Sequence, residues 1–225
     1  NYPNKPVKIV IPFAVGGPVD TIARILSQRL STVTGQTVLV DNRGGGGGVI
    51  GPSIVTKANP DGYTILLSTG SMTSNPAFNA DIPFDTLKDF TPVTMLARNY
   101  GQLFVVNPNM PVNSVSEFIQ YAKTSTKGLN YGAAGIGNIT YIAPEMMKTM
   151  TGIKMKDIEY KGTAPAISDL MGGHIDLCFV GTQNLLSLVQ SGKLKALAIT
   201  GPTRWNELPD VPTMHERSEE HTSEL

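Results

Sequence analysis

Cysteine, histidine and charged residues are all scarce in this chain of 225 residues. Cys178 is the only cysteine, which excludes a disulfide framework and a thiolate metal cluster. Its apolar setting, IDLCFV, indicates a small buried side chain. The 18 basic residues balance 18 acidic ones, so the basic field that nucleic acid requires is missing. No apolar run reaches the roughly 18 residues of a membrane-spanning helix, so we expect no such helix.

The motifs of common enzyme classes are also missing. GxSxG, HExxH and GxxxxGK[ST] do not occur. His174 lies in a GGHID turn, where a solvated side chain is expected, and His215 and His221 lie near the end of the chain. Asp20 is expected to cap a helix rather than to act as a base. Without a nucleophile, base and orienting group together, we expect a binding protein rather than an enzyme, with no metal and no cofactor.

Glycine and proline are plentiful, at 23 and 16 residues, and they punctuate a repeated strand–helix pattern. Strands are expected at 7–13, 37–42, 63–68, 129–134, 158–161, 175–180 and 194–200, and extended segments at 91–99 and 102–107. Helices are expected from Gly17 to Gly35 and at 49–58, 117–125, 138–150 and 183–192, and a loop followed by a helix is expected within 162–173. Repeated units with apolar, parallel-type strands predict two α/β domains. We place them at 1–100 and 101–216, with a hinge-like boundary between Arg98 and Leu103.

Helical spacing predicts which side chains are buried. A capping box of Ser114 and Glu117 is expected to open the helix at 117–125. One face of the first helix is expected to carry the apolar residues Ile22, Ile25, Leu26, Leu30 and Val33. A methionine cluster on a later helix is expected to pack in the core, and it comprises Met146, Met147 and Met150.

Gly46-x-Gly48-x-x-Gly51 formally matches a dinucleotide-binding fingerprint. Such a site also needs an acidic residue at the end of the next strand. That strand, YTILLSTG, has none, so NAD binding is rejected. A tight, flexible loop is the favoured interpretation of Gly44–Gly48, although its amides could still meet an anion.

Four loops combine glycine or hydroxyl residues with a following helix start. They are PFAVGG at 12–17, in which Phe13–Gly17 would supply the amides, STGSMTSNP at 68–76, GAAGIGNIT at 132–140 and YKGTAP at 160–165. Each could be an ordinary capped helix start. Because ligands of open α/β sheets bind beyond the carboxyl ends of the strands, four such loops on one predicted edge favour an anion-binding cleft between the domains.

The last nine residues, 217–225, differ in composition from the rest of the chain. RSEEHTSEL is poor in apolar residues, and its back-translation corresponds to a common sequencing-adapter sequence. We therefore expect these residues to be an artefact without regular structure and the natural C-terminal part to be truncated. The start, NYPNKPVKIVIPF, is expected to be a mature N-terminus from which a leader has been removed.

Eight motifs follow one another as in a known family. They are YPNKPVKIVIPFAVGG, VDNRGGGGGVIG, PDGYTILL, PFDTLKDFTPVTML, LNYGAAGIGN, YKGTAPAISDLMGGHIDL, GKLKALAIT and ELPDVPT. From about Tyr2 to Thr213, the chain resembles the Bug family of periplasmic solute-binding proteins of tripartite tricarboxylate transporters, the TctC type. The resemblance implies a two-domain Venus-flytrap fold with parallel-rich sheets and a C-terminal part that returns to complete the first domain.

The resemblance also implies ligand contacts, carried over motif by motif. In the first domain these are Phe13, Ala14, Val15, Gly16, Gly17, Ser71 and Asn75. In the second domain they are Ala134, Gly135, Ile136, Gly137, Asn138, Thr163, Gly181 and Thr182. Two departures from the family pattern stand out. Pro18 and Val19 stand where the family usually has a glycine and a hydroxyl residue. Val180-Gly181 ends a strand where many members carry an acidic residue, and its absence disfavours amino acids as ligands.

The resemblance implies a periplasmic monomer that passes a dicarboxylate, tricarboxylate or aromatic acid to membrane transporter subunits. The ligand carboxylates would be held by loop amides, hydroxyls and helix dipoles. Two alternatives stay open. A hydrolase of carboxylate esters would show turnover that is lost on Ser71→Ala, and a ligand-sensing subunit for a membrane kinase would show kinase genes in its neighbourhood.

Overall fold

The computed structural model describes residues 2–219. Its contacts divide the chain into two compact units, and each unit is described by itself. The first comprises Asn1–Thr94, Ala134–Ile139 and Glu159–Pro165. The second comprises Met95–Ala133, Thr140–Ile158 and Ala166–Leu225. The division into domains at 1–100 and 101–216 stays a prediction.

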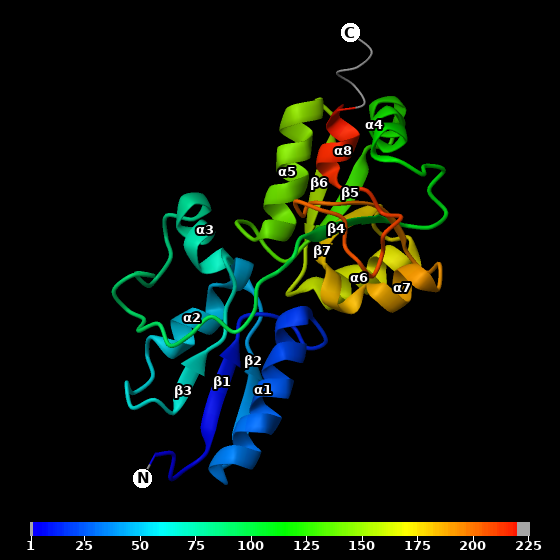
Figure 1. Cartoon of the computed structure of the whole chain (residues 1–225). Helices are drawn as coiled ribbons and strands as arrows, with labels where there is room; N and C mark the ends of the chain where they lie inside the picture. Colours follow the sequence, from blue (N-terminus) through cyan, green and yellow to red (C-terminus); the bar gives the residue numbers. More distant parts are fainter. Residues whose placement is uncertain (1, 220–225) are drawn as a thin grey trace. The chain divides into compact units, whose positions relative to one another are not determined.

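The first unit is built on a three-stranded parallel sheet with the order β2-β1-β3 (Figure 1). Its strands are β1 (Val7–Ile11), β2 (Val38–Asn42) and β3 (Thr64–Leu66). Its helices are α1 (Pro18–Thr34), the short 3-10 helix η1 (Gly46–Gly48), α2 (Ile50–Val55) and α3 (Ser71–Phe78). β1 is buried because it lies between the other two strands, and its apolar, β-branched sequence suits that position.

The ends of α1 follow from local chemistry. Pro18 occupies the first helical turn, where its missing N–H costs nothing, and Gly35 ends the helix in the left-handed conformation at φ 69°. Ala23, Leu26 and Leu30 pack on the strands. The prediction was wrong for Ile25 and Val33, which are exposed, because the buried stripe is narrower than the apolar face of the sequence.

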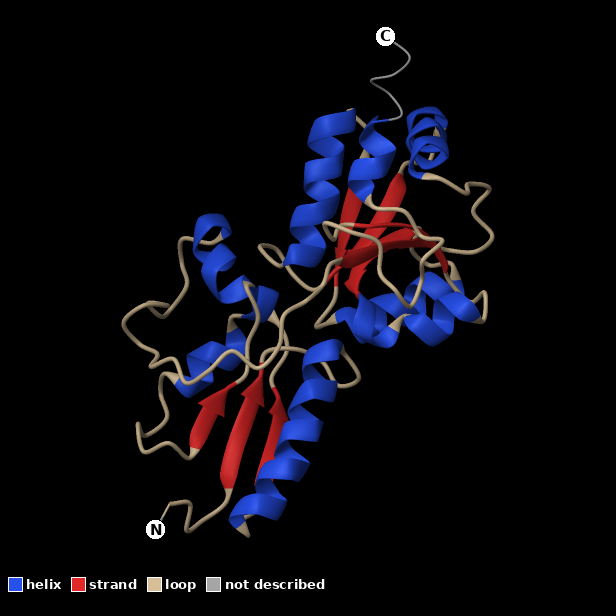
Figure 2. Cartoon of the chain, in the orientation of Figure 1, coloured by secondary structure: helices blue, strands red, loops and turns tan. Residues whose placement is uncertain are grey.

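The second unit contains a five-stranded mixed sheet with the order β6-β5-β7-β4-β8. Its strands are β4 (Gln102–Val106), β5 (Leu129–Ala133), β6 (Met155–Glu159), β7 (Leu177–Gly181) and β8 (Lys195–Ile199). Its helices are α4 (Val115–Thr124), α5 (Ile139–Thr151), α6 (Thr163–Gly172), η2 (Thr182–Asn184), α7 (Leu186–Gln190) and α8 (Met214–Glu219), with the first residues of α5 and α6 counted in the first unit. Figure 2 shows α4, α5 and α8 on one side of this sheet and α6 and α7 on the other.

An aromatic cluster forms the centre of the second core. The Phe104 ring stacks on Phe179 at a centroid distance of 4.7 Å and meets Phe118 edge-on at 4.9 Å. Ser114 caps α4 as predicted, since its Oγ accepts from the amide of Glu117 at 3.1 Å, whereas the Glu117 side chain accepts from the amide of Asn113 at 2.7 Å. β4 runs antiparallel to β7 and β8, so the second sheet is parallel only in part.

Three local predictions were wrong. Residues 91–99 form no strand and are exposed, because they have no neighbouring strand to pair with among residues 2–219. Ser71–Phe78 forms the helix α3 where a loop was expected. On α5, Met147 is 5% exposed as predicted, but Met146 is 58% and Met150 is 78% exposed, because only one face of α5 meets the sheet.

The end of the chain also differs from its prediction. α8 continues to Glu219, so residues 217–219 are helical rather than irregular. Thr213 and Glu216 exchange backbone-to-side-chain hydrogen bonds at 3.0 and 3.1 Å, and this box starts the helix that carries them. The remaining predicted artefact residues, 220–225, lie outside the described residues. Within 2–219, no helix combines the length and the apolar character that a bilayer crossing needs.

Candidate ligand-binding site

The carboxyl ends of the three parallel strands define one edge of the first unit. β1 pairs with β2 on one side and with β3 on the other, so the loop after β1 leaves the sheet where the strand order reverses. Ligands of open α/β sheets bind beyond the carboxyl ends of the strands at such a point. The loop is Phe13–Gly17, as the sequence motif predicts.

Two amides of this loop are used within the protein. Ala14 N donates to the carbonyl oxygen of Lys161 at 2.8 Å, and Gly16 N donates to Asp20 Oδ2 at 2.9 Å. The whole loop was expected to lay its amides against an anion, but the amides of Ala14 and Gly16 already donate to groups of the protein. Phe13 is buried in the core of the unit, where its side chain supports the loop.

Asp20 anchors the loop from the first turn of α1. Its side chain is only 3% exposed, and it also accepts hydrogen bonds from Arg24 Nε at 2.9 Å and Asn42 Nδ2 at 3.0 Å. Burial by itself raises the pKa of the Asp20 carboxyl, but the hydrogen bonds from Arg24, Gly16 and Asn42 outweigh it and hold the pKa below its usual value. Asp20 has a structural role, as predicted, although it serves the loop rather than the amides of the helix.

The five-glycine loop makes close backbone contacts with two other loops. A Cβ atom on Gly44 would lie 2.6 Å from the Lys161 carbonyl oxygen. A Cβ atom on Gly135 would lie 2.1 Å from the Cα of Gly47, so any side chain at this crossing would collide with the backbone. Within the first unit, these glycines allow the loops at 44–48, 134–138 and 161–163 to meet.

α3 links the loops further through its polar side chains. Asn75 is buried and donates from Nδ2 to the Gly47 carbonyl oxygen at 3.0 Å. Ser74 Oγ donates to the Gly137 carbonyl oxygen at 2.5 Å. Ser71 is buried too, with its hydroxyl 2.8 Å from that of Thr69. The structure therefore brings Ser71 and Asn75 to the edge where the sequence placed them, but on a helix rather than in a loop.

Two buried polar atoms at this edge have no hydrogen-bond partner among the described residues. They are Asn75 Oδ1 and Ser68 Oγ. Ser68 follows β3 within the STGSMTSNP motif, but the sequence did not single it out. Because unpaired buried polar groups are unfavourable, such atoms in a native protein are commonly completed by water or ligand. The sequence pattern of hydroxyl residues after a strand was the signal that could have identified Ser68.

Residues Ala134–Asn138 and Thr163 also belong to the first unit. Ala134 and Asn138 are buried and Ile136 is exposed. The Thr163 hydroxyl lies 3.3 Å from the position that a Cβ atom on Gly17 would occupy. Val15 is exposed, and Gly17 directly precedes α1.

In the second unit, Gly181 ends β7 and Thr182 begins η2. Thr182 is buried, and the part that these two residues take in ligand binding stays a prediction. Among residues 2–219, no group of three or more histidine, cysteine or acidic side chains could hold a metal ion. Burial raises the pKa of the Cys178 thiol to about 12, which makes it a poor nucleophile.

Comparison with known families identifies the chain. The family profile described as the tripartite tricarboxylate transporter family receptor, TctC, matches residues 22–224. The chain belongs to this family. Three curated relatives, among them BugT of Bordetella pertussis, are 33 to 35% identical over 96% of this chain. The chain spans 62 to 66% of the length of these relatives.

Similar solved structures confirm the predicted fold class. An R. palustris protein with adipate is 36% identical and matches with a TM-score of 0.91 over 96% of this chain and 72% of its own. MatC from Rhodopseudomonas palustris with bound malate is 30% identical and matches with a TM-score of 0.87 over 96% of this chain and 73% of its own. The periplasmic binding protein BugD is 36% identical and matches with a TM-score of 0.86 over 96% of this chain and 72% of its own, so the mixed, parallel-rich α/β architecture is similar to that of periplasmic binding proteins.

Proposed function

We propose that this TctC-type chain belongs to an extracytoplasmic solute-binding protein that captures a small carboxylate for a tripartite tricarboxylate transporter. Its partners would be the ligand and the membrane subunits of the transporter, and it would act in the periplasm as a monomer. The similar structures that hold adipate and malate support a dicarboxylate as the ligand.

The observation that carries the proposal is the chemistry of the strand edge in the first unit. Its loops at 13–17, 68–75, 134–138 and 161–163 contain hydroxyl, amide and glycine residues and no aspartate or glutamate. Asp20, in the first turn of α1, already receives hydrogen bonds from Gly16, Arg24 and Asn42, and Asp41 of β2 pairs with Lys8 and Arg43. An anion would therefore meet donors rather than a like charge.

Ester hydrolysis is the weaker alternative, and the surroundings of Ser71 argue against it. The Ser71 hydroxyl lies 2.8 Å from the Thr69 hydroxyl, and a hydroxyl cannot act as the general base that a serine nucleophile needs. We therefore propose binding without turnover. Ester turnover by the purified protein that is abolished by Ser71→Ala would overturn this point.

A thermal-shift screen tests the proposed function. Adipate, malate and succinate are the carboxylate probes, and putrescine and glucose are the controls of different charge. An acid at 100 times its dissociation constant should raise the apparent stability by about 2.7 kcal/mol, while the controls should not. A folded protein whose melting no carboxylate shifts would exclude this function.

A further inference from the structure

A hollow of about 270 Å³ lies at the amino-terminal ends of two neighbouring strands of the second unit, β5 and β6. Its lining consists of three lysines and four further residues, namely Lys127, Lys154, Lys156, Gly128, Leu129, Asn130 and Met155. The first lysine precedes β5, and the other two stand at the start of β6. All seven residues belong to the second unit, so the hollow shares no residue with the candidate site of the first unit.

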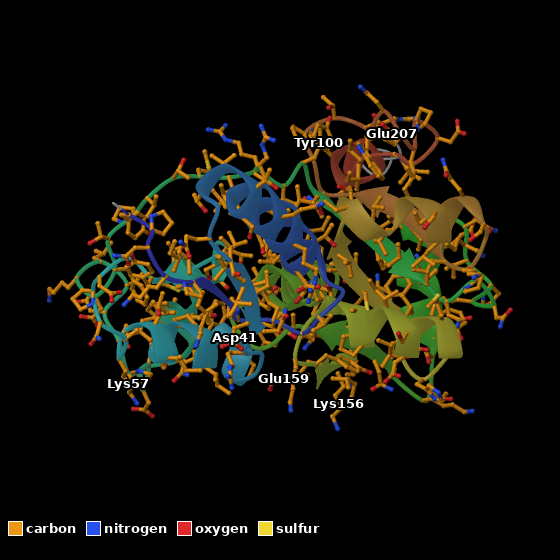
Figure 3. All side chains as sticks on the ribbon, turned by 90° about the horizontal axis from the view of Figure 1, so that it is seen from below. Asp41, Lys57, Tyr100, Lys156, Glu159 and Glu207 are labelled. Carbon is orange, nitrogen blue, oxygen red and sulfur yellow. The ribbon has the colours of Figure 1, made fainter. Side chains whose placement is uncertain are left out.

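The lysine side chains lie at the surface. Strand alternation places Lys154 and Lys156 on one face of β6, while Met155 between them is buried at 7% exposure. Lys156, labelled in Figure 3, projects from the ribbon. Lys127 and the other two lysines are exposed. A Cβ atom on Gly128 would meet nothing within 4 Å, so the turn before β5 leaves the hollow open.

The positive charge of the hollow is not neutralised by the protein. No acid lines it, and none of its three lysines forms an ion pair within the described part of the chain. The acids nearby in the fold are placed differently. Asp157 lies on the same face of β6 as Met155, and Glu159 lies at the far end of that strand. Asp176 accepts a hydrogen bond from the amide of Asn130 at 2.7 Å.

Protection of a sheet edge would explain only part of this arrangement. Lysines on an edge strand hinder pairing with another chain, and β6 is an edge strand in the sheet order of the described residues. This role accounts for Lys154 and Lys156. It does not account for Lys127, because β5 lies between β6 and β7 in the interior of the sheet. A shared anionic ligand accounts for all three lysines.

The number of donors indicates the kind of anion. A phosphate group carries up to about two negative charges at pH 7 and offers three strong acceptor oxygens, whereas a carboxylate carries one charge on two oxygens. Each lysine ammonium can donate to one phosphate oxygen. We propose that Lys127, Lys154 and Lys156 form a second anion site, which binds the phosphate group of a small phosphorylated molecule or of a lipid headgroup. This inference does not rest on the proposed function.

Calorimetric titration of the full chain with inorganic phosphate tests the site. Lys154→Gln together with Lys156→Gln should weaken phosphate binding about tenfold, and Lys127→Gln alone should weaken it about three- to fivefold. Lys57→Gln together with Lys193→Gln is the matched control, because it also removes two positive charges at exposed positions. The control should change the affinity less than about twofold, since charges outside the site are screened by salt.

Vesicle flotation identifies the source of the phosphate group. Retention of the protein on phosphatidylglycerol vesicles, but not on phosphatidylcholine vesicles, assigns a lipid headgroup if the Lys154→Gln, Lys156→Gln double variant is not retained. Phosphate binding without retention on either kind of vesicle assigns a small phosphorylated ligand.

The contrary outcomes are equally definite. A protein that binds neither phosphate nor phosphatidylglycerol vesicles overturns the inference, and so does equal weakening in the double variant and its control. Self-association of the double variant, when the wild type binds neither probe, would show that the lysines only protect the edge of the sheet. Malate binding by the same variants should be unchanged, so failure of the phosphate site leaves the proposed function intact.

Discussion

At the residue scale, buried polar side chains hold the loops of the first unit in place. Asp20 joins the loop before α1 to the side chains of Arg24 and Asn42, and Asn75 joins α3 to the glycine loop. Each of these hydrogen bonds occupies a loop donor or acceptor that could otherwise bind a ligand. The groups left for binding are consequently fewer than the sequence motifs suggest.

The first residue-scale prediction concerns Thr163. α6 begins at this residue, so Gly162 holds the N-cap position and the Thr163 hydroxyl is not needed as a cap. We expect Thr163→Val to leave the melting of ligand-free protein nearly unchanged and to weaken carboxylate binding about five- to tenfold. Calorimetry and thermal melting together check this. A loss of about 1 kcal/mol of stability with unchanged affinity would instead indicate a capping role.

The second residue-scale prediction concerns the backbone crossing at Gly135. Gly135→Ala places a methyl group on the backbone of Gly47 and puts a side chain at φ 104°, so we expect it to destabilise the protein by about 3 kcal/mol or more. Gly128→Ala is the matched control, because Gly128 has φ 69° with nothing within 4 Å of its added Cβ. It should cost only about 1 kcal/mol. Urea unfolding measures both, and equal losses would show that the crossing is not tightly packed.

At the element scale, two helices differ from expectation, besides the segment 91–99, which forms no strand. α3 forms in a stretch rich in serine, threonine and asparagine, residues with modest helix propensity. It is held by contacts that local sequence does not reveal, such as those of Ser74 with Gly137 and of Asn75 with Gly47. α8 likewise begins at a box between Thr213 and Glu216 and extends into residues that were expected to be irregular.

Deletion of residues 217–225 tests the element-scale interpretation of the chain end. The capping box precedes these residues, and Arg204 pairs with Glu216 at 3.0 Å, so the start of α8 keeps its contacts. We expect the deletion to leave the melting temperature and carboxylate affinity unchanged within error. A drop of several degrees in melting would show that the last helical turn stabilises the second unit.

At the scale of the whole molecule, one buried carboxylate, Asp20, and one half-buried carboxylate, Glu145, make stability depend on pH. Burial opposes ionisation of Glu145, but hydrogen bonds from Lys148 and Tyr131, both at 2.6 Å, hold the pKa of its carboxyl below the usual value. The pKa of Asp20 is lowered in the same way. The unfolded chain therefore binds protons more readily than the folded one at these two positions.

The expected result is a loss of stability on acidification. The contribution of these groups is complete above their unfolded pKa values, 4.5 for Glu145 and 3.8 for Asp20, and it is lost as the pH falls through the lower folded values. Chemical unfolding between pH 7 and pH 3 measures this. Asp20→Asn should reduce the slope more than Asp85→Asn, because the Asp85–Lys88 pair is exposed and screened by solvent. Equal slopes in the two variants would contradict the role given to Asp20.

Much of the fold was determined by the sequence itself, because its signals are local. Apolar β-branched runs and terminal glycines specified β1, β2, β7 and the end of α1, and the order of eight motifs specified the TctC family.

Only the tertiary structure decided features that depend on distant partners. β4 pairs antiparallel with β7 and β8. Met150 is exposed because α5 turns only one face to the sheet. The amide of Ala14 donates to the carbonyl oxygen of Lys161, which is distant in the chain. Hydrogen bonds between residues far apart in the chain leave no periodic trace in the sequence, so the loops of the candidate site could be predicted while their free donors and acceptors could not.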